Sequence, residues 1–226
     1  KKSATEVWAA PNSTQTNPHA TLIVGNYYYV MTRTSPTVLY RFNIDDLSTY
    51  TSITFPNLGL HSNCDQMIYV NNKIYIAFGG GYNYHLSVVQ VNPTTITDTT
   101  TVINYHSTAF NGGLPFTTDG TYMYICSDAG AGMNYADSIF KYRISDWSLI
   151  SKCQVTSGSD KSYPHAIGYD GSNLYVTTTC FESGQGYLNR VYRVGTACNA
   201  TPTEYLNIYS SMCDEFAIEG DRLYIG

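Results

Sequence analysis

Charge is scarce in this sequence. Only 13% of the 226 residues are charged, the formal net charge is −5 at pH 7, and no run of lysine or arginine occurs. Proteins that bind nucleic acid through its phosphates need clustered Lys and Arg side chains. We therefore expect no nucleic-acid partner.

Long apolar runs are missing too. No apolar stretch approaches the roughly 20 residues of a membrane-spanning helix, and the first ten residues, KKSATEVWAA, lack the apolar core of a signal peptide. We expect no direct insertion into a membrane. Because the sequence starts without Met, we also expect a processed product or a piece of a longer protein.

The motifs of three common classes of site are absent. The sequence contains no G-x-S-x-G elbow, no P-loop and no complete dinucleotide fingerprint. Its GGGY run at 79–82 lies between two expected strands, without the helix that phosphate binding requires. These absences exclude the corresponding hydrolase and nucleotide sites.

Tyrosine is abundant where charge is not. The chain has 22 Tyr, and 43% of its residues are hydrophobic, which is enough for a core. Aromatic and β-branched residues suit pleated strands, whereas strong helix formers are few. The composition predicts an all-β protein.

Six cysteines and two N-x-S/T sequons, at Asn12 and Asn199, favour an oxidising, extracellular location. Cys126 and Cys153 fall in one of the repeats described next, and Cys180 and Cys198 fall in the following one. Disulfides within a repeat are therefore one arrangement, although the sequence alone does not decide the pairing.

A repeat of about 50 residues runs through the chain. Its anchor is a tyrosine between apolar residues, in the tripeptides YYV, IYI, MYI, LYV and LYI; the five anchors are Tyr29, Tyr75, Tyr124, Tyr175 and Tyr224. They align without gaps for ten residues upstream. The turn dipeptides VG, VN, DG, DG and EG stand five and four residues before them, so each unit begins with two strands joined by a tight turn.

Two further strands follow in four of the units. The third strand has an apolar, apolar or aromatic, polar, apolar order, at 39–42, 88–91, 139–142 and 191–194. A looser fourth strand follows, and Pro-, Gly- and Ser-containing links lead to the next unit. Four-stranded units at this period are typical of propeller blades.

The DGSNLYV, NNKIYI and GDRLYIG units resemble those of YVTN- and kelch-like β-propellers. The resemblance implies a single domain over 1–226 with five blades of four antiparallel strands, which start near residues 18, 64, 113, 164 and 213. The fifth unit ends after its second strand. We expect residues 1–11, which include TEVWAAP, to supply a strand that closes the ring, because closure removes exposed sheet edges.

Ionisable residues recur ten positions before the anchors. These positions hold His19, Asp65, Leu114, His165 and Asp214, and the propeller register gathers them around the mouth of the central channel. Two imidazoles and two carboxylates could bind a divalent cation of the zinc or calcium type, with no cofactor required otherwise. The simpler interpretation is a hydrated mouth where His and Asp side chains hydrogen-bond one another.

The same carboxylates permit an enzymatic hypothesis. Asp65 and Asp214, with Glu215 beside the second, could act as nucleophile or base and as general acid in glycoside hydrolysis. The blade number resembles that of five-bladed furanosidase-type glycoside hydrolases. The third unit departs from that pattern, because GGLPFT offers no acid.

The loops between the second and third strands share this face. They are rich in Gly, Ser, Asn and Tyr and lengthen from the first unit to the fourth. Rigid aromatic side chains on such loops suit recognition. The candidate binding residues are Tyr82, Tyr84, Tyr135, Phe181 and Tyr187.

These patterns lead to one main expectation and two alternatives. The main one is an extracellular or virion-surface adhesion module that binds a glycan or a cell-surface or structural protein, as a receptor- or carbohydrate-binding domain does. The alternatives are a glycoside hydrolase and a structural component of a surface assembly. A propeller fold by itself does not choose among them.

Overall fold

The structure is a computed structural model of the 226-residue chain. It describes residues 18–32, 36–55, 66–79, 85–106, 114–127, 138–155, 162–182, 186–199, 202–208, 216–219 and 222–225. Every regular element within these ranges is a β-strand, and none is a helix long and apolar enough to cross a membrane.

The strands form five antiparallel sheets, as the repeat predicted, and we number them as blades one to five. Blade one holds β1 (Pro18–Val24), β2 (Tyr27–Thr32), β3 (Thr37–Asn43) and β4 (Asp46–Phe55). Blade two holds β5 (Met67–Val70), β6 (Lys73–Phe78), β7 (His85–Val91) and β8 (Thr99–His106). Blade three holds β9 (Phe116–Thr118), β10 (Tyr122–Ser127), β11 (Ser138–Arg143) and β12 (Leu149–Gln154). Blade four holds β13 (Ser162–Tyr169), β14 (Asn173–Glu182), β15 (Gly186–Gly195) and β16 (Thr203–Ile208), and blade five holds β17 (Phe216–Glu219) and β18 (Arg222–Ile225).

The register is the same in all five blades. Each anchor tyrosine lies opposite the residue seven positions earlier in the chain; the pairs are Leu22↔Tyr29, Ile68↔Tyr75, Thr117↔Tyr124, Gly168↔Tyr175 and Ala217↔Tyr224. A slip by one residue would move every buried side chain to the other face of the sheet. The gap-free alignment of the sequence therefore corresponds to a true structural repeat.

The turn dipeptides explain how this register is kept. Gly25, Asn71, Gly120 and Gly171 occupy the second position of their dipeptides, and all four have positive φ. Asn72, which follows Asn71, also has positive φ, so this pair forms a two-residue hairpin turn of the I′ type. These residues tolerate the left-handed backbone that the tight turns require.

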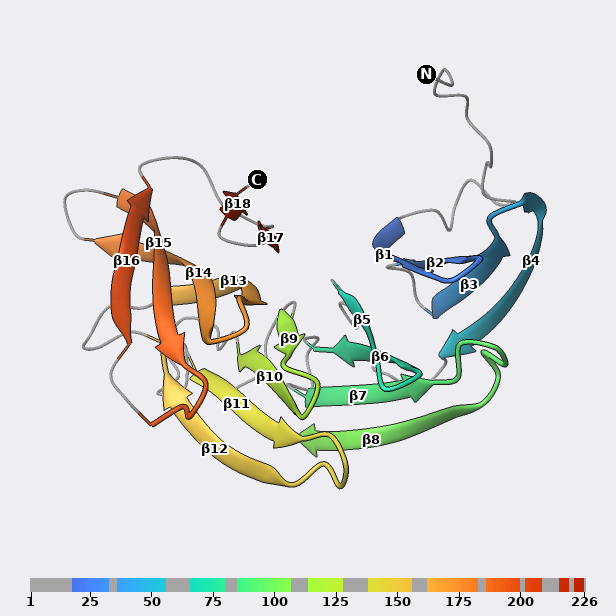
Figure 1. The fold of residues 1–226 in the computed structure, drawn as a ribbon, viewed down its shortest axis with the longest axis horizontal. Coiled ribbons are helices and arrows are strands. Elements are labelled where there is room, and N and C mark those ends of the chain that lie inside the picture. The colour runs from blue at the N-terminus through green and yellow to red at the C-terminus, as the bar shows by residue number, and fades with distance from the viewer. Residues whose placement is uncertain are drawn as a thin grey trace, which may run out of the picture.

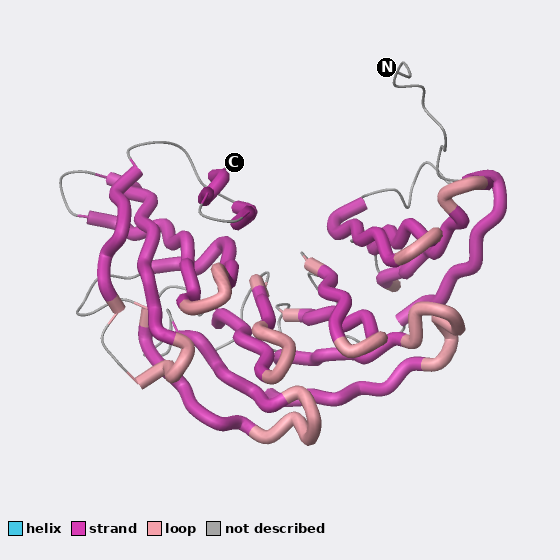
Figure 2. Tube along the Cα trace, in the orientation of Figure 1, coloured by secondary structure: helices cyan, strands magenta, loops and turns pink. Residues whose placement is uncertain are grey.

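The blades follow one another around an open arc (Figure 1), in which every described regular segment is a strand (Figure 2). The innermost strands lie side by side, with β1 beside β5, and β13 between β9 and β17. Blade one and the strands β17 and β18 stand at the two ends of the arc (Figure 1). The predicted closing strand at 1–11 lies outside the described residues, so closure of the ring stays a prediction.

The hydrophobic core lies between the blades. One cluster joins blades one and two through Met31, Leu39, Ile74 and Ile76, and a second joins blades two and three. A third joins blades three and four. Each second strand is buried on both faces because a neighbouring blade covers each side, as the burial of β6 and β10 shows.

A polar contact recurs beside this core. Each anchor tyrosine lies opposite the polar residue of the third strand, and we call the two residues the anchor pair; the pairs are Tyr29–Arg41, Tyr75–Gln90, Tyr124–Lys141 and Tyr175–Arg193. In blade one, the Tyr29 hydroxyl donates to the Pro93 carbonyl oxygen at 2.6 Å, and Arg41 Nη1 donates to the same oxygen at 3.1 Å and to the Thr94 carbonyl. Pro93 belongs to the turn between β7 and β8, so the anchor pair of one blade holds a turn of the next.

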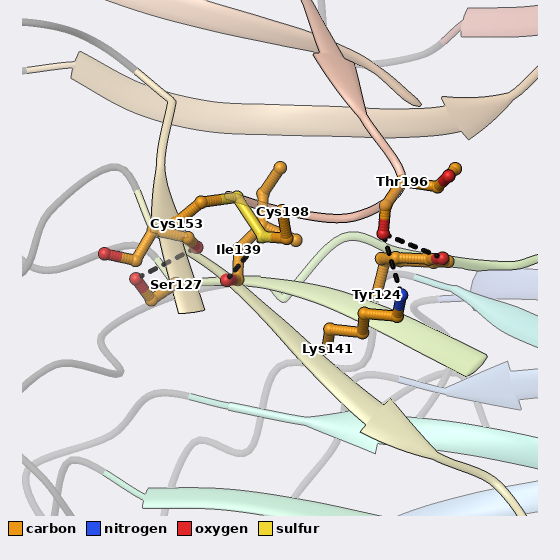
Figure 3. The surroundings of a disulfide bond; sticks show 8 residues. Tyr124, Ser127, Ile139, Lys141, Cys153, Thr196 and Cys198 are labelled. Carbon is orange, nitrogen blue, oxygen red and sulfur yellow. Dashed lines mark hydrogen bonds between the residues drawn. A yellow bond between two sulfur atoms is a disulfide. The ribbon is translucent and has the colours of Figure 1, made fainter. Parts of the chain in front are cut away.

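The next two blades use the same arrangement with different chemistry. Lys141 Nζ donates to the Thr196 carbonyl oxygen at 2.8 Å, in the turn after β15, and lies 4.0 Å from the ring centroid of Tyr122 (Figure 3). Tyr75 instead packs its ring on Trp147 of the following turn, with centroids 5.2 Å apart. Each turn also contributes buried side chains to the core between blades, including Ile96, Ile144 and Cys198.

A disulfide links the same turn of blade four to blade three (Figure 3). It joins Cys153 in β12 to Cys198, with the Cα atoms 5.2 Å apart. A pairing of Cys126 with Cys153 within one repeat is therefore wrong. The reason is geometric, because β10 and β12 lie on opposite sides of β11, whereas the turn of blade four packs directly against blade three.

The buried anchor tyrosines make the stability sensitive to alkali. Burial, and then a hydrogen bond to Asp119, raises the pKa of Tyr124, and burial raises those of Tyr29 and Tyr75. A raised pKa stabilises the fold fully below the unfolded value of about 10, and this contribution is lost as pH rises above it. We expect Tyr124→Phe to flatten the decline of the unfolding free energy above about pH 10, by up to about 1.4 kcal/mol per pH unit.

Urea unfolding at about pH 8 and about pH 10.5 measures this effect. Tyr205→Phe is the matched control, because Tyr205 is 56% exposed. Equal pH dependence in wild type and Tyr124→Phe would contradict the prediction.

The disulfide should contribute measurably to stability. Replacing both Cys153 and Cys198 by Ala is expected to lower the unfolding free energy by about 2–5 kcal/mol, because the unfolded chain regains the freedom of the loop. Urea unfolding with and without a reductant measures the change. The reductant should destabilise wild type and leave the double variant unchanged, and a double variant as stable as oxidised wild type would refute the role.

Candidate functional site

Two innermost strands begin with the same local irregularity. The pairing of β1 with β2 shifts between Pro18 and Ala20, and the pairing of β13 with β14 shifts between Pro164 and Ala166. Both shifts have the form of a β-bulge at the histidine of a PHA tripeptide. Bulges redirect a side chain and are over-represented beside active sites.

The bulged histidines are held close to the protein. His19 and His165 are both half-buried, and one ring nitrogen of each, Nδ1 of His19 and Nε2 of His165, is shielded from solvent. Both also interact with neighbouring groups. The two side chains are therefore positioned groups at equivalent places of blades one and four.

Blade three differs at this level. Leu114 occupies the corresponding position and is fully buried, as the absence of an acid in GGLPFT predicted. The Phe116 amide two residues later donates to Gln66 Oε1 at 3.1 Å, which ties blade two to blade three. This part of the mouth is consequently an apolar wall fixed by Gln66.

The carboxylates of the predicted site lie outside the described residues. Asp65 immediately precedes Gln66, and Asp214 and Glu215 immediately precede β17. Their catalytic and metal-binding roles therefore stay predictions. Within the described residues no three His, Cys, Asp or Glu side chains gather as a metal site, and β1 and β13, which carry His19 and His165, lie on different sides of the arc (Figure 1).

The candidate binding aromatics divide into two groups. Tyr82, Tyr84 and Tyr135 lie outside the described residues. Phe181 and Tyr187 belong to β14 and β15, where their Cα atoms pair directly, so the sequence assigned both to a loop that is in fact the end of a long hairpin. The β-branched run Thr177–Thr179 continues the strand past the point where the other blades turn, which is why the loop was predicted too long.

Blade four carries a polar layer that the sequence analysis missed. Thr177, Thr179 and Asn189 are all buried, and Thr179 Oγ1 lies 2.7 Å from Asn189 Oδ1 as its hydrogen-bond donor. Thr177 stands two residues after its anchor, where blades one and two have Met31 and Ala77. The change from apolar to polar at this position was the available signal.

The polar layer lies on the face of blade four that bears Tyr175. Residues 175, 177 and 179 point to one side of β14, because side chains alternate along a strand. In blades one to three this side faces the following blade. The inner part of blade four therefore offers hydrogen-bonding groups toward β17, the strand beside β13.

Comparison with known proteins gives a fold and no family. No protein-family model matches the chain, and no curated protein matches it. Among similar solved structures are a xylan β-1,4-xylosidase from Bacillus halodurans (TM-score 0.52, 15% identity, 86% of this chain and 43% of that chain) and a mutant α-L-arabinanase from Cellvibrio cellulosa (TM-score 0.51, 11% identity, 82% and 72%). A computationally designed protein, Ika4, is also similar (TM-score 0.53, 10% identity, 85% and 99%).

These likenesses differ in extent. The chain spans less than half the length of the xylosidase, and 46% of a matched chain from an S. cerevisiae complex containing Nup159. Identities of this size carry the fold only. The comparisons and the five antiparallel sheets together show that the chain has the β-propeller fold.

The polar layer of blade four should be costly to break on one side. Asn189→Ala removes the acceptor of the buried Thr179 hydroxyl and is expected to destabilise the protein by about 1–3 kcal/mol. Adding Thr179→Val should recover part of this loss, because no buried hydroxyl then remains without its acceptor. Chemical unfolding of both variants, with the exposed Asn104→Ala as control, measures the effect, and additive losses would exclude the coupling.

Proposed function

We propose that the protein is a glycoside hydrolase that binds a polysaccharide at the inner ends of its blades. The observation that carries this proposal is the common register of the five blades, with matching bulges at His19 and His165. The same register aligns Asp65 and Asp214 with these histidines in the sequence. The printed names of the xylosidase and the arabinanase, which share the fold, support a carbohydrate substrate.

The reaction needs two carboxyl groups with different tasks. One protonates the leaving glycosidic oxygen, and the other attacks the anomeric carbon or activates a water molecule. Asp65 on blade two and Asp214 on blade five serve these tasks, with Glu215 as the alternative to Asp214. His19 and His165 hydrogen-bond sugar hydroxyls or the carboxylates and so orient the sugar ring between them.

Recognition of a glycan without cleavage is the second candidate. Leu114 leaves blade three without a polar group at the level of the site, which favours a binding surface over a complete catalytic ring. Tyr82, Tyr84, Tyr135, Phe181 and Tyr187 would then stack on the sugar. In this form the protein is an extracellular adhesion or surface-assembly module, and the Cys153–Cys198 disulfide supports an oxidising location.

Substitution of the carboxylates tests the proposal. Asp65→Asn and Asp214→Asn should each lower the release of sugar from arabinan or xylan by about 10²–10⁴-fold, the usual contribution of a positioned acid or base. The unfolding free energy should change by less than about 1 kcal/mol, since the amide keeps the shape of the carboxyl group. Reducing-sugar assays on a polysaccharide panel provide the measurement.

The control is Asp45→Asn, because Asp45 is exposed in the turn between β3 and β4, away from the inner-strand starts. It should leave turnover unchanged. Binding without turnover, weakened by Tyr187→Ala, would replace hydrolysis with recognition. Neither binding nor turnover on the panel would refute both candidates.

A further inference from the structure

The anchor pairs of blades one and three read the same feature of the following blade. In both, a Lys or Arg on the third strand donates to a main-chain carbonyl of the following turn, and an anchor tyrosine lies opposite it. The following turn also pushes a side chain into the core between the blades, Ile96 in one case and Cys198 in the other. An anchor pair is therefore a binding site for the turn of a β-hairpin.

Blade four has the complete pair. Tyr175 lies directly opposite Arg193, in the same register as Tyr124 opposite Lys141. Asp170 hydrogen-bonds the Tyr175 hydroxyl, as Asp119 does for Tyr124, and this contact follows burial among the causes that raise the pKa of Tyr175. The hydroxyl is thus already oriented, before any turn is bound.

The described part of blade five supplies no turn to this pair. Its sheet consists of β17 and β18 alone, whereas blades two, three and four each bring a third and a fourth strand joined by the turn. Arg193 is exposed, in contrast to Lys141, which is 9% exposed. Among the described residues no carbonyl accepts a hydrogen bond from Arg193.

Two further features mark the same end of the molecule. One edge of β18 has no partner strand in the described sheet, so its backbone can pair with an added strand. Apolar surface accompanies this edge, because Tyr205, Leu206 and Tyr224 are 56%, 43% and 46% exposed. Tyr205 packs edge-on against Tyr175, with ring centroids 5.4 Å apart.

We propose that this end of the arc is a docking site for a β-hairpin donated by a partner polypeptide. The first strand of the hairpin pairs along β18, and its turn presents a main-chain carbonyl oxygen to Arg193 and Tyr175. An apolar residue of the turn lies against Val191 and Tyr205, as Ile96 lies in the core between blades one and two. The interface continues the contact between blades, with the chemistry that Tyr29 and Arg41 use for Pro93.

A hairpin fused to the full chain tests the site directly. The probe is a second copy of residues 85–106, whose turn already satisfies an anchor pair, attached after Gly226 through a Gly/Ser linker. Docking should slow hydrogen exchange of the β18 backbone amides by at least about tenfold relative to a fusion with the same residues in scrambled order, because pairing protects edge amides. Arg193→Ala combined with Tyr175→Phe should return the exchange to the scrambled level.

Two outcomes of the exchange experiment would overturn the proposal. Equal exchange in both fusions would mean that the end does not accept a hairpin, and protection that survives the double substitution would mean that the anchor pair does not recognise the turn. Sedimentation of the unfused chain adds a further arm. A dimer that Arg193→Ala dissolves would make a second copy of this chain the occupant in place of a separate hairpin.

Discussion

The structure depends on one repeated contact, in which a blade holds the turn of the blade after it. Three anchor pairs make this contact with three chemistries, through a guanidinium on carbonyl oxygens, an aromatic ring on Trp147, and an ammonium on the Thr196 carbonyl. A turn carbonyl buried between two sheets would be costly without a donor. The polar residue of each third strand removes that cost at the point where the core clusters meet the solvent.

This contact also sets how cooperative the molecule is. Each blade touches only its neighbours, so stability is approximately a sum of blade terms and nearest-neighbour terms. Blade four is bound to blade three by the anchor pair, the core cluster and the disulfide, whereas toward blade five it offers a polar layer and an exposed Arg193. Local opening therefore starts more readily at the end with blade five than between blades three and four.

The sequence predicted the fold well because the repeat is encoded in local pattern. Tyrosine anchors, turn dipeptides with positive φ and strands buried on both faces are short-range signals, and together they fixed five blades and one register. Contacts between blades left weaker traces. The Cys153–Cys198 pairing depends on how blade four packs on blade three, and the extent of the last long hairpin depends on Thr177–Thr179.

The candidate site was predicted less completely, for a related reason. His19 and His165 were identified by their spacing, and the structure added the bulges that orient them. The pair of Thr179 and Asn189 was missed, because a buried threonine or asparagine has no periodic signature. Asp65, Asp214 and Glu215 remain assignments made from register alone.

The disulfide has a mechanical consequence. A force applied to the two ends of the chain passes through the bond between Cys153 and Cys198, which lie 45 residues apart in the sequence. The enclosed segment contains most of blade four, including β13 and β14. It stays out of the extended length, which is shorter by about 150 Å at roughly 3.4 Å per residue. Only reduction of the bond would release that hidden length, so tension and redox state act on the same blade.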